Sequence, residues 1–451
     1  MSEPLSSDPV TEGLLKSLPV PVLPHIVSEW AAIIPLVCHL ANERDDYTTA
    51  GKVALAGSLS VGYFPRLGSL SGIARLLNNP GKFSDHANSR GGTSLNVWDV
   101  LWGGSFPCGN GAAVDSILKV CDQRSGQSNI MDMPDVVRPK VGPGSHPPHQ
   151  ATISGNSPMP AANSPQFRRY QTLHVYNCKH IGEDRKPKRT RSKRIPPTIR
   201  LIVASGLVAL LVIIGAYGTA AVLFCTTFSN AVASFLLTVH RPPGYLQNNE
   251  STMESGFMLA AAHQNASEWY LFTGDRGVVD SLLNKPMFWI PESKTAYWVG
   301  QWFKAANFLQ LIAMTFTAGQ KSWDGVCLII LLATNWLLDV IANSDASLAR
   351  QWMKRERVSI EAKTFRFSGR SVMLGAIQLW SKSSTSSWMD DIMAPHPRRE
   401  AWLKCLEHGE RPDEEVWTSG DISRIQLTAG LSAKAAGILQ AEFPKIIRKE
   451  V

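Results

Sequence analysis

Four glycines, Gly103, Gly104, Gly109 and Gly111, cluster in the stretch WGGSFPCGNG. A glycine-rich loop can cradle a phosphate group, because its backbone N–H groups approach the ligand closely. No GK[ST] triplet follows the stretch, and no clear strand pattern precedes it. We therefore interpret it as a plain glycine-rich loop rather than a phosphate site.

Residue pairs that could hold a metal are too sparse for a site. His146 and His149 form an HPPH motif in a proline-rich stretch, and Asp390-Asp391 lacks a third acid at useful spacing. Seven cysteines are scattered without a CxxC pair, and the GxSxG, HExxH, Walker and kinase signatures are absent from the sequence. The sequence predicts no catalytic, metal or cofactor site.

A basic run, RKPKRTRSKR, occupies residues 185–194 just before an apolar stretch. Such charges hold their flank of a membrane segment in the cytosol, and each attracts anionic lipid headgroups by about 1 kcal/mol. The run is either purely topogenic or a lipid-binding switch that phosphorylation of Thr190 and Ser192 would weaken. We expect a lipid bilayer as partner and no nucleic acid. The basic residues are Arg185, Lys186, Lys188, Arg189, Arg191, Lys193 and Arg194.

The apolar stretch at residues 201–239 contains no Asp, Glu, Lys or Arg. Roughly 20 apolar residues suffice to cross a hydrocarbon core about 30 Å thick, so the stretch predicts a membrane segment. As one helix it would be about 58 Å long, which is more than one span needs. Either residues 201–225 cross and the remainder lies in the far leaflet, or two short helices turn near Ser229 and Asn230.

Small residues recur within this stretch at helical spacing, as Gly215, Ala216, Thr219 and Ala220. Two overlapping pairs four residues apart allow another helix to approach closely in lipid. The pattern predicts a helix contact, within the bundle, with a membrane-protein partner or in a homo-oligomer.

A second span is predicted at residues 326–342, and residues 305–318 are apolar but accompanied by Lys304, Asn307 and Gln310. We interpret Asp339 as an interfacial carboxylate. Four basic residues follow the span and place that end in the cytosol, so an even number of spans must lie between the two basic flanks. These residues are Arg350, Lys354, Arg355 and Arg357.

An aromatic, more polar loop at residues 240–300 carries two N-x-[ST] sequons, at Asn249 and Asn265. With two spans the loop is lumenal or extracellular and both asparagines are glycosylation candidates. With four spans, in which residues 226–239 and 305–318 also cross, the loop returns to the cytosol. Two spans are favoured, because Lys304, Asn307 and Gln310 make the segment at 305–318 expensive to insert and residues 226–239 are short for a span.

The expected fold class is mainly α: an integral membrane protein with two to four transmembrane helices, a small mixed outside loop domain and a mixed α/β cytosolic tail. No signal peptide is apparent, and apolar runs at residues 26–41 and 53–64 predict interfacial or packed helices. In the tail, KTFRFSG predicts a strand, SVMLGAIQLW a helix, and the stretch from Pro397 to Gly409 another helix. The expected regions are a cytosolic, partly amphipathic N-terminal region at 1–123, a disordered Pro/Ser-rich linker at 124–200, a first membrane stretch at 201–239, the loop domain at 240–300, a second membrane region at 301–343 and the cytosolic tail at 344–451.

Three stretches, GDRGVVDSLLNKPM at 274–287, RSVMLGAIQLW at 370–380 and WMDDIMAPHPRREAW at 388–402, resemble large multi-pass membrane proteins of filamentous fungi. This group has no assigned activity, and the resemblance covers roughly the C-terminal half of the chain. It implies a membrane protein of fungal origin and carries over no site residues.

These features predict an anchoring or interaction protein of the endomembrane system or plasma membrane. A transporter or channel subunit is the second hypothesis, and the small number of predicted spans argues against it. A membrane-bound enzyme is third, because the sequence shows no acid, base and nucleophile constellation.

Overall fold

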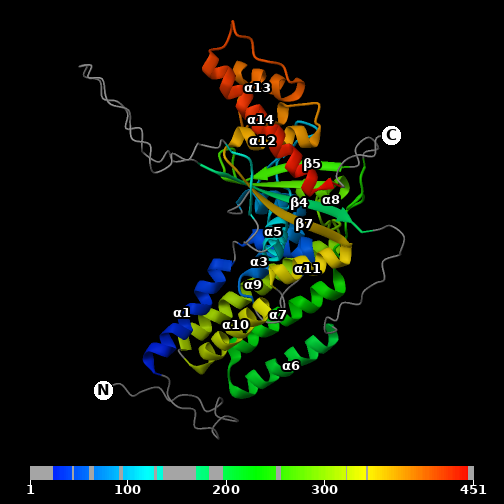
Figure 1. Cartoon of the computed structure of the whole chain (residues 1–451). Helices are drawn as coiled ribbons and strands as arrows, with labels where there is room; N and C mark the ends of the chain where they lie inside the picture. The colour runs from blue at the N-terminus through cyan, green and yellow to red at the C-terminus, as the bar shows by residue number, and fades with distance from the viewer. Residues whose placement is uncertain are drawn as a thin grey trace, which may run out of the picture.

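The chain folds around one mixed β-sheet, and a bundle of long helices projects on one side of it (Figure 1). The protein is mostly helical. The computed structural model describes residues 24–42, 45–59, 66–90, 95–125, 130–135, 169–181, 197–249, 255–320, 322–341 and 344–444.

Seven strands form the sheet, in the order β2-β1-β5-β6-β4-β7-β3. The β4·β6 and β3·β7 pairs are parallel, and the other neighbours are antiparallel. The strands are β1 (Asn96–Asp99), β2 (Ser105–Pro107), β3 (Ile130–Asp132), β4 (Gln171–His180), β5 (Ser255–Ala261), β6 (Glu268–Asp275) and β7 (Val358–Phe367).

Helices cover both faces of the sheet, because side chains alternate along each strand. Leu173 and Val175 of β4 point into a core shared with the C-terminal helices α12, α13 and α14. Tyr176 and Cys178 point to the opposite core, which includes residues of α5, α8 and α11. The bounds are α5 (Gly111–Ser125), α8 (Arg276–Leu283), α11 (Asp345–Glu356), α12 (Arg370–Ser381), α13 (Pro397–His408) and α14 (Ser419–Glu442).

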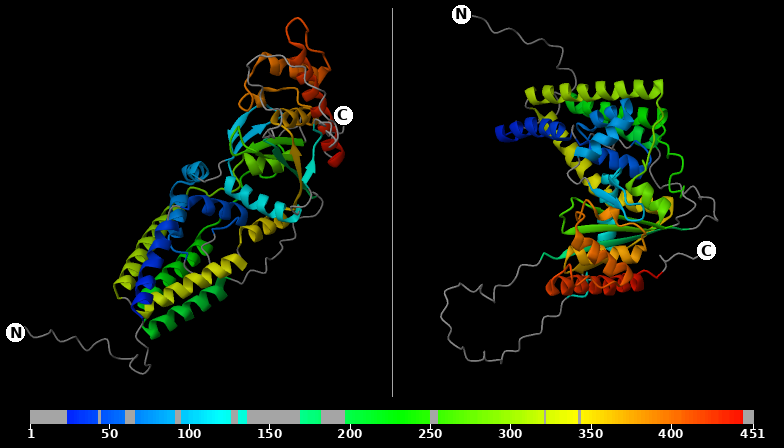
Figure 2. Two further views of the ribbon diagram at one scale, coloured as in Figure 1. Left: turned by 60° about the vertical axis from the view of Figure 1, so that its left-hand side comes forward. Right: turned by 90° about the horizontal axis from the view of Figure 1, so that it is seen from above.

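Five helices make up the bundle, and α6 lies at its edge beside α7 (Figures 1 and 2). At about 1.5 Å per residue they are about 27 to 40 Å long. Three shorter helices, α2 (Asp46–Ala56), α3 (Ser69–Asn78) and α4 (Pro80–Arg90), lie between the bundle and the sheet. The bundle helices are α1 (His25–Asn42), α6 (Pro197–Ile214), α7 (Tyr217–Leu236), α9 (Lys294–Gln320) and α10 (Trp323–Ile341).

Two helical hairpins leave the sheet domain and return to it. The α6–α7 hairpin is inserted between β4 and β5, and the α9–α10 hairpin lies between α8 and α11, which precedes β7. Because β4, β5, β6 and β7 belong to one sheet, both hairpins begin and end at the same side of the molecule.

The sequence predicts that the loop at residues 240–300 lies across a membrane from the segments before and after the apolar stretches. The sheet topology contradicts this prediction. Strand β6 of the loop pairs with β4, which precedes the first apolar stretch, and β4 pairs with β7, which follows the second. Hydrogen-bonded strands cannot lie on opposite sides of a bilayer about 30 Å thick. The two-span arrangement, with this loop across the membrane from its flanks, is therefore wrong.

The expected course of the first apolar stretch is also wrong. Its helices turn at Gly215 and Ala216, not near Ser229 and Asn230, both of which lie inside α7. Gly215 has φ +84°, a left-handed conformation that glycine adopts without strain. Likewise, residues 124–200 are not only linker, because they include β3 and the internal strand β4.

Several local predictions are confirmed. The KTFRFSG stretch overlaps β7, SVMLGAIQLW lies in α12, and α13 begins at Pro397 and is capped by Gly409 with φ +70°. Residues 26–41 lie in α1, whereas residues 60–64 of the second apolar run lie outside the described residues. Helix α14, which the sequence analysis did not identify, packs against α12 and α13.

Candidate functional site: the helical bundle

The bundle exposes an unusual amount of apolar surface. Monomeric soluble proteins rarely expose contiguous apolar patches larger than a few hundred Å². Most of the exposed large hydrophobic side chains of the described residues belong to the five bundle helices, and each helix contributes at least five. The aliphatic and phenylalanine members include Ile26, Ile33, Val37 and Leu40 of α1, Ile202, Val203, Leu210 and Ile213 of α6, Phe224, Phe228 and Phe235 of α7, Phe308, Ile312 and Phe316 of α9, and Ile330, Leu337 and Val340 of α10.

Exposed aromatic side chains lie toward both ends of this apolar surface. At the end far from the sheet are Trp30 of α1, Tyr217 of α7 and Trp323 of α10. They share a level, because Gly325 abuts Ala31 and Gly218 abuts Asp324. Toward the sheet, the exposed rings are Tyr297, Trp298 and Trp336.

The far ends of the two hairpins are joined by the buried carboxylate of Asp324, at the start of α10. Its oxygens accept hydrogen bonds from the backbone N–H groups of Gly218 at 2.7 Å and Thr219 at 2.8 Å, and from the Thr219 hydroxyl. Asp324 is only 3% exposed, so the first turn of α7 is capped by a side chain from another helix. This contact explains where α7 begins.

Further polar contacts join α7 to α9. Gln310 donates from Nε2 to the Thr226 hydroxyl at 2.8 Å, and the Trp302 indole donates to Ser229 Oγ at 3.1 Å. Within the described chain, the side-chain oxygens of Gln310, Asn307 and Asn335 are buried without a hydrogen-bond partner. The interior of the bundle is thus partly polar, although its outside is apolar.

The four small residues expected to mediate helix packing lie at the α6–α7 turn and in the first turn of α7. Thr219 and Ala220 are buried, and Ala216 is 3% exposed. Ala216 and Ala220 pack in a cluster with Leu211 of α6 and Leu331 of α10, and Thr219 bonds Asp324. Their contacts are between helices of the same chain, and Gly215 forms the turn.

By length and composition, one described helix, α7, could cross a membrane of ordinary thickness. The segments Leu201–Ile214 of α6 and Trp323–Leu338 of α10 are apolar but shorter. About 44% of the most apolar part of α7 is buried in the structure. Length alone therefore does not distinguish a membrane helix from a core helix, and the exposed apolar surface is the stronger observation.

The two sequon asparagines are exposed and lie on the sheet domain. Asn265 occupies the β5–β6 connection, where its Oδ1 accepts a hydrogen bond from Arg370 at 2.7 Å. Asn249 lies beside Gly244, in the chain between α7 and β5. Both are on the same side of the bundle as β4 and β7.

The other polar residues considered in the sequence do not come together as a site within the described part of the chain. The basic run at 185–194 and the HPPH motif lie outside the described residues, as does the side chain of Asp339. Asp390 forms an ion pair of 2.7 Å with the buried Arg399. Among the described residues, no three His, Cys, Asp or Glu side chains gather as a metal site.

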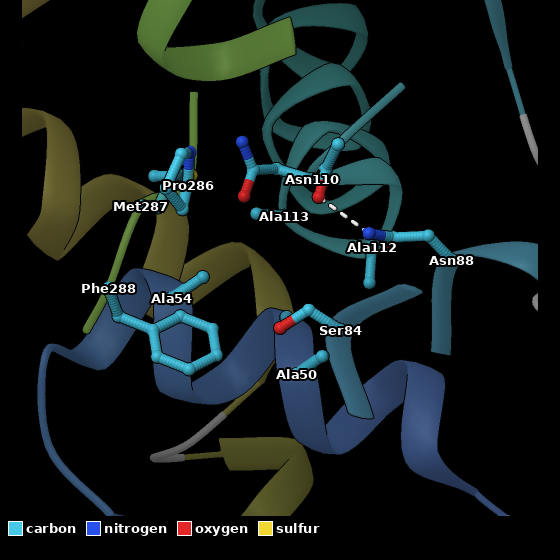
Figure 3. Close-up of a pocket in the computed structure, with 12 residues that line it drawn as sticks. Ala50, Ala54, Ser84, Asn88, Asn110, Ala112, Ala113, Pro286, Met287 and Phe288 are labelled. Carbon is cyan, nitrogen blue, oxygen red and sulfur yellow. Dashed lines mark hydrogen bonds between the residues drawn. The ribbon is translucent and has the colours of Figure 1, made fainter. Parts of the chain in front are cut away.

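The glycine-rich stretch spans the β1–β2 turn and the start of α5. A Cβ atom at Gly103 would lie 2.1 Å from Ser387 Oγ, and one at Gly109 would lie 2.9 Å from the Asn284 carbonyl oxygen, so close packing requires both glycines. Beside Gly109, a cavity of about 40 Å³ lies between α2, α4 and α5 (Figure 3). Asn88 and Asn110 border it, and their side-chain amides donate hydrogen bonds to backbone carbonyls. The small volume of the cavity leaves room for little more than water.

A polar patch occupies the sheet face beside the end of α5. His174 shares a hydrogen bond of 3.1 Å with the Thr364 hydroxyl and stacks on Tyr270 at 5.4 Å. Burial lowers the pKa of His174, partly offset by the charges of Asp122 and Glu268. Burial raises the pKa of Tyr270 to about 12. Sequence analysis missed this patch, because its members come from strands far apart in the chain.

No protein family, curated protein or solved structure matches the chain.

Proposed function

We propose that the protein is an integral membrane anchor, whose helical bundle holds the sheet domain against the cytosolic face of a membrane for interaction with a partner. The observation that carries this proposal is the apolar surface on all five bundle helices, with exposed aromatic rings at both ends. The acyl chains of lipids would cover such an apolar surface and keep it from water, and Trp and Tyr concentrate at membrane interfaces.

In this arrangement α6, α7, α9 and α10 cross the bilayer as two hairpins, and α1 lies beside them as a fifth embedded helix. The single sheet supports this topology, because it keeps β4, β5, β6 and β7 on one side. Basic residues before α6 and after α10 favour the cytosolic side for the sheet domain. The run at 185–194 would there contact anionic headgroups.

A transporter or channel subunit is the second candidate. It is favoured by the buried side-chain oxygens of Asn307, Gln310 and Asn335, which have no partner within the described chain. Polar groups inside a membrane bundle often mark a substrate path. The resemblance to multi-pass fungal membrane proteins fits either candidate and assigns no activity.

Glycosylation mapping tests the membrane arrangement. The full chain is expressed in a eukaryotic membrane, in its native form and with a loop containing an N-x-T sequon inserted between Lys321 and Ser322, long enough to extend clear of the bilayer. We expect the inserted asparagine to be glycosylated and Asn249 and Asn265 to remain unmodified, because the α9–α10 turn faces the lumen and the sheet domain the cytosol.

Alkaline extraction of the same membranes provides the control for insertion. A protein released by carbonate would contradict membrane embedding. Retention together with a mass shift abolished by Asn249→Gln and Asn265→Gln would contradict the cytosolic position of the sheet domain.

A further inference from the structure

The apolar belt of the bundle is short in four of its five helices. In α6 it is limited by Arg200 and the turn at Gly215, which leaves residues 201–214 without charge. In α10 it runs between Asp324 and Asp339, over residues 325–338. At about 1.5 Å per residue, each belt is about 21 Å long.

The other two helices give similar lengths. In α9 the exposed Lys304 limits the belt to residues 305–320, about 24 Å long. In α1 the exposed Glu29 limits it to residues 30–42, about 20 Å long. A lysine can extend its side chain toward the interface, so Lys304 alone would not fix the length of a belt. The belts of four helices, however, end at different residues and have similar lengths.

The longer helix α7 is the exception, because it is apolar over its whole length. One side of its half nearer the sheet packs against protein, since Cys225 and Ala233 join a buried cluster with Leu70 and Ile73 of α3, whereas Phe228 and Phe235 of the same half are exposed. The contacts of Gly325 with Ala31 and of Gly218 with Asp324 align the far ends of α1, α7 and α10. The short belts therefore start at the same height along the bundle, so they do not combine into a longer apolar surface.

We propose that the bundle fits a thin bilayer, with a hydrocarbon core of about 20–24 Å rather than about 30 Å. This inference rests on the proposed membrane embedding and specifies the lipid partner. Hydrophobic mismatch sorts proteins between membranes, and endoplasmic-reticulum bilayers are thinner than sterol-rich plasma membranes. The protein accordingly resides in thin endomembranes.

Reconstitution tests the fit. The purified full chain is inserted into phosphatidylcholine vesicles whose monounsaturated acyl chains range from about 14 to about 22 carbons. The readout is the fraction of protein that floats with the vesicles and resists carbonate. We expect retention at least about threefold higher with the shortest chains than with the longest.

A lengthened variant makes the test specific. Lys304→Leu extends the α9 belt toward the sheet and should shift the best chain length upward, whereas Lys434→Leu, an exposed lysine on α14, should not. Retention that is equal across lipids, or greatest in the thickest, would overturn the thin-bilayer inference and leave embedding intact. Failure to insert into any vesicle would overturn the membrane anchor itself.

Discussion

At the residue scale, the structure pairs side chains that the sequence shows only as isolated polar residues. Asp324 caps α7 from another helix, and Gln310 and Trp302 join α9 to α7. In the sheet domain, His174 and Thr364 meet across neighbouring strands. These contacts set the positions of the elements, and burial lowers the pKa of the His174 imidazole.

His174→Asn should flatten the dependence of stability on pH. Burial lowers the pKa of His174 in the folded chain below its ordinary value of about 6.5, so the unfolded chain binds more protons when the pH falls through that value. The free energy of unfolding of the native protein therefore decreases from about pH 7.5 toward pH 5.5, and this loss should be smaller in the variant. Thermal unfolding of the full chain in mild detergent measures it.

The control is His408→Asn, which changes an exposed histidine at the end of α13. It should leave the pH dependence of the native protein unchanged. Equal pH slopes for the native chain and His174→Asn would show that the half-buried imidazole does not contribute to the pH dependence of stability.

At the element scale, the bundle depends on close approach of α7 to its neighbours. A Cβ atom at Gly218 would lie 2.0 Å from Thr317 Oγ1 and 2.9 Å from Asp324 Oδ2. Gly206 of α6, in contrast, has no atom within 4 Å of its Cβ position. Two glycines of the same apolar stretch thus have opposite environments.

Gly218→Ala should destabilise the bundle by about 1–3 kcal/mol, because the added methyl group overpacks the contact between α7, α9 and α10. Gly206→Ala is the matched control and should be neutral or stabilise α6 by up to about 1 kcal/mol, the helix preference of alanine over glycine. Thermal unfolding in detergent compares the variants. A Gly218→Ala protein as stable as the control would mean that the hairpins do not pack as described.

At the scale of the whole molecule, one sheet gathers strands that flank both hairpins, so the hairpins are insertions into a single α/β domain. Residues assigned by sequence to a linker, an outside loop and a tail form neighbouring strands β4, β6 and β7. In the membrane arrangement proposed above, the sheet permits only an even number of crossings in each insertion, which is a stronger constraint on topology than the flanking charges.

In the proposed arrangement, protease digestion of sealed vesicles with their cytosolic face outward should protect α1 at about residues 25–42 and two separate hairpins at about residues 197–236 and 294–341. The sheet domain between them should be cleaved, because it lies on the accessible side. Mass spectrometry of the membrane pellet identifies the fragments. One protected fragment that runs from the first hairpin through residues 255–275 to the second would contradict the shared cytosolic sheet.

The sequence by itself determined the features that depend on neighbouring residues. Charge-free runs identified the apolar segments, Pro397 and Gly409 delimited α13, and alternation in KTFRFSG identified part of β7. Each follows from local propensity or from the periodicity of side chains along one element.

Only the tertiary structure decided how these pieces join. The pairing of β4 with β6 and β7 links residues that lie on either side of each hairpin, and a strand's own sequence does not specify its neighbours. The first turn of α7 is capped by Asp324, more than a hundred positions away in the chain. Hydrogen bonds and packing between distant segments therefore decide that both hairpins begin and end at the same sheet.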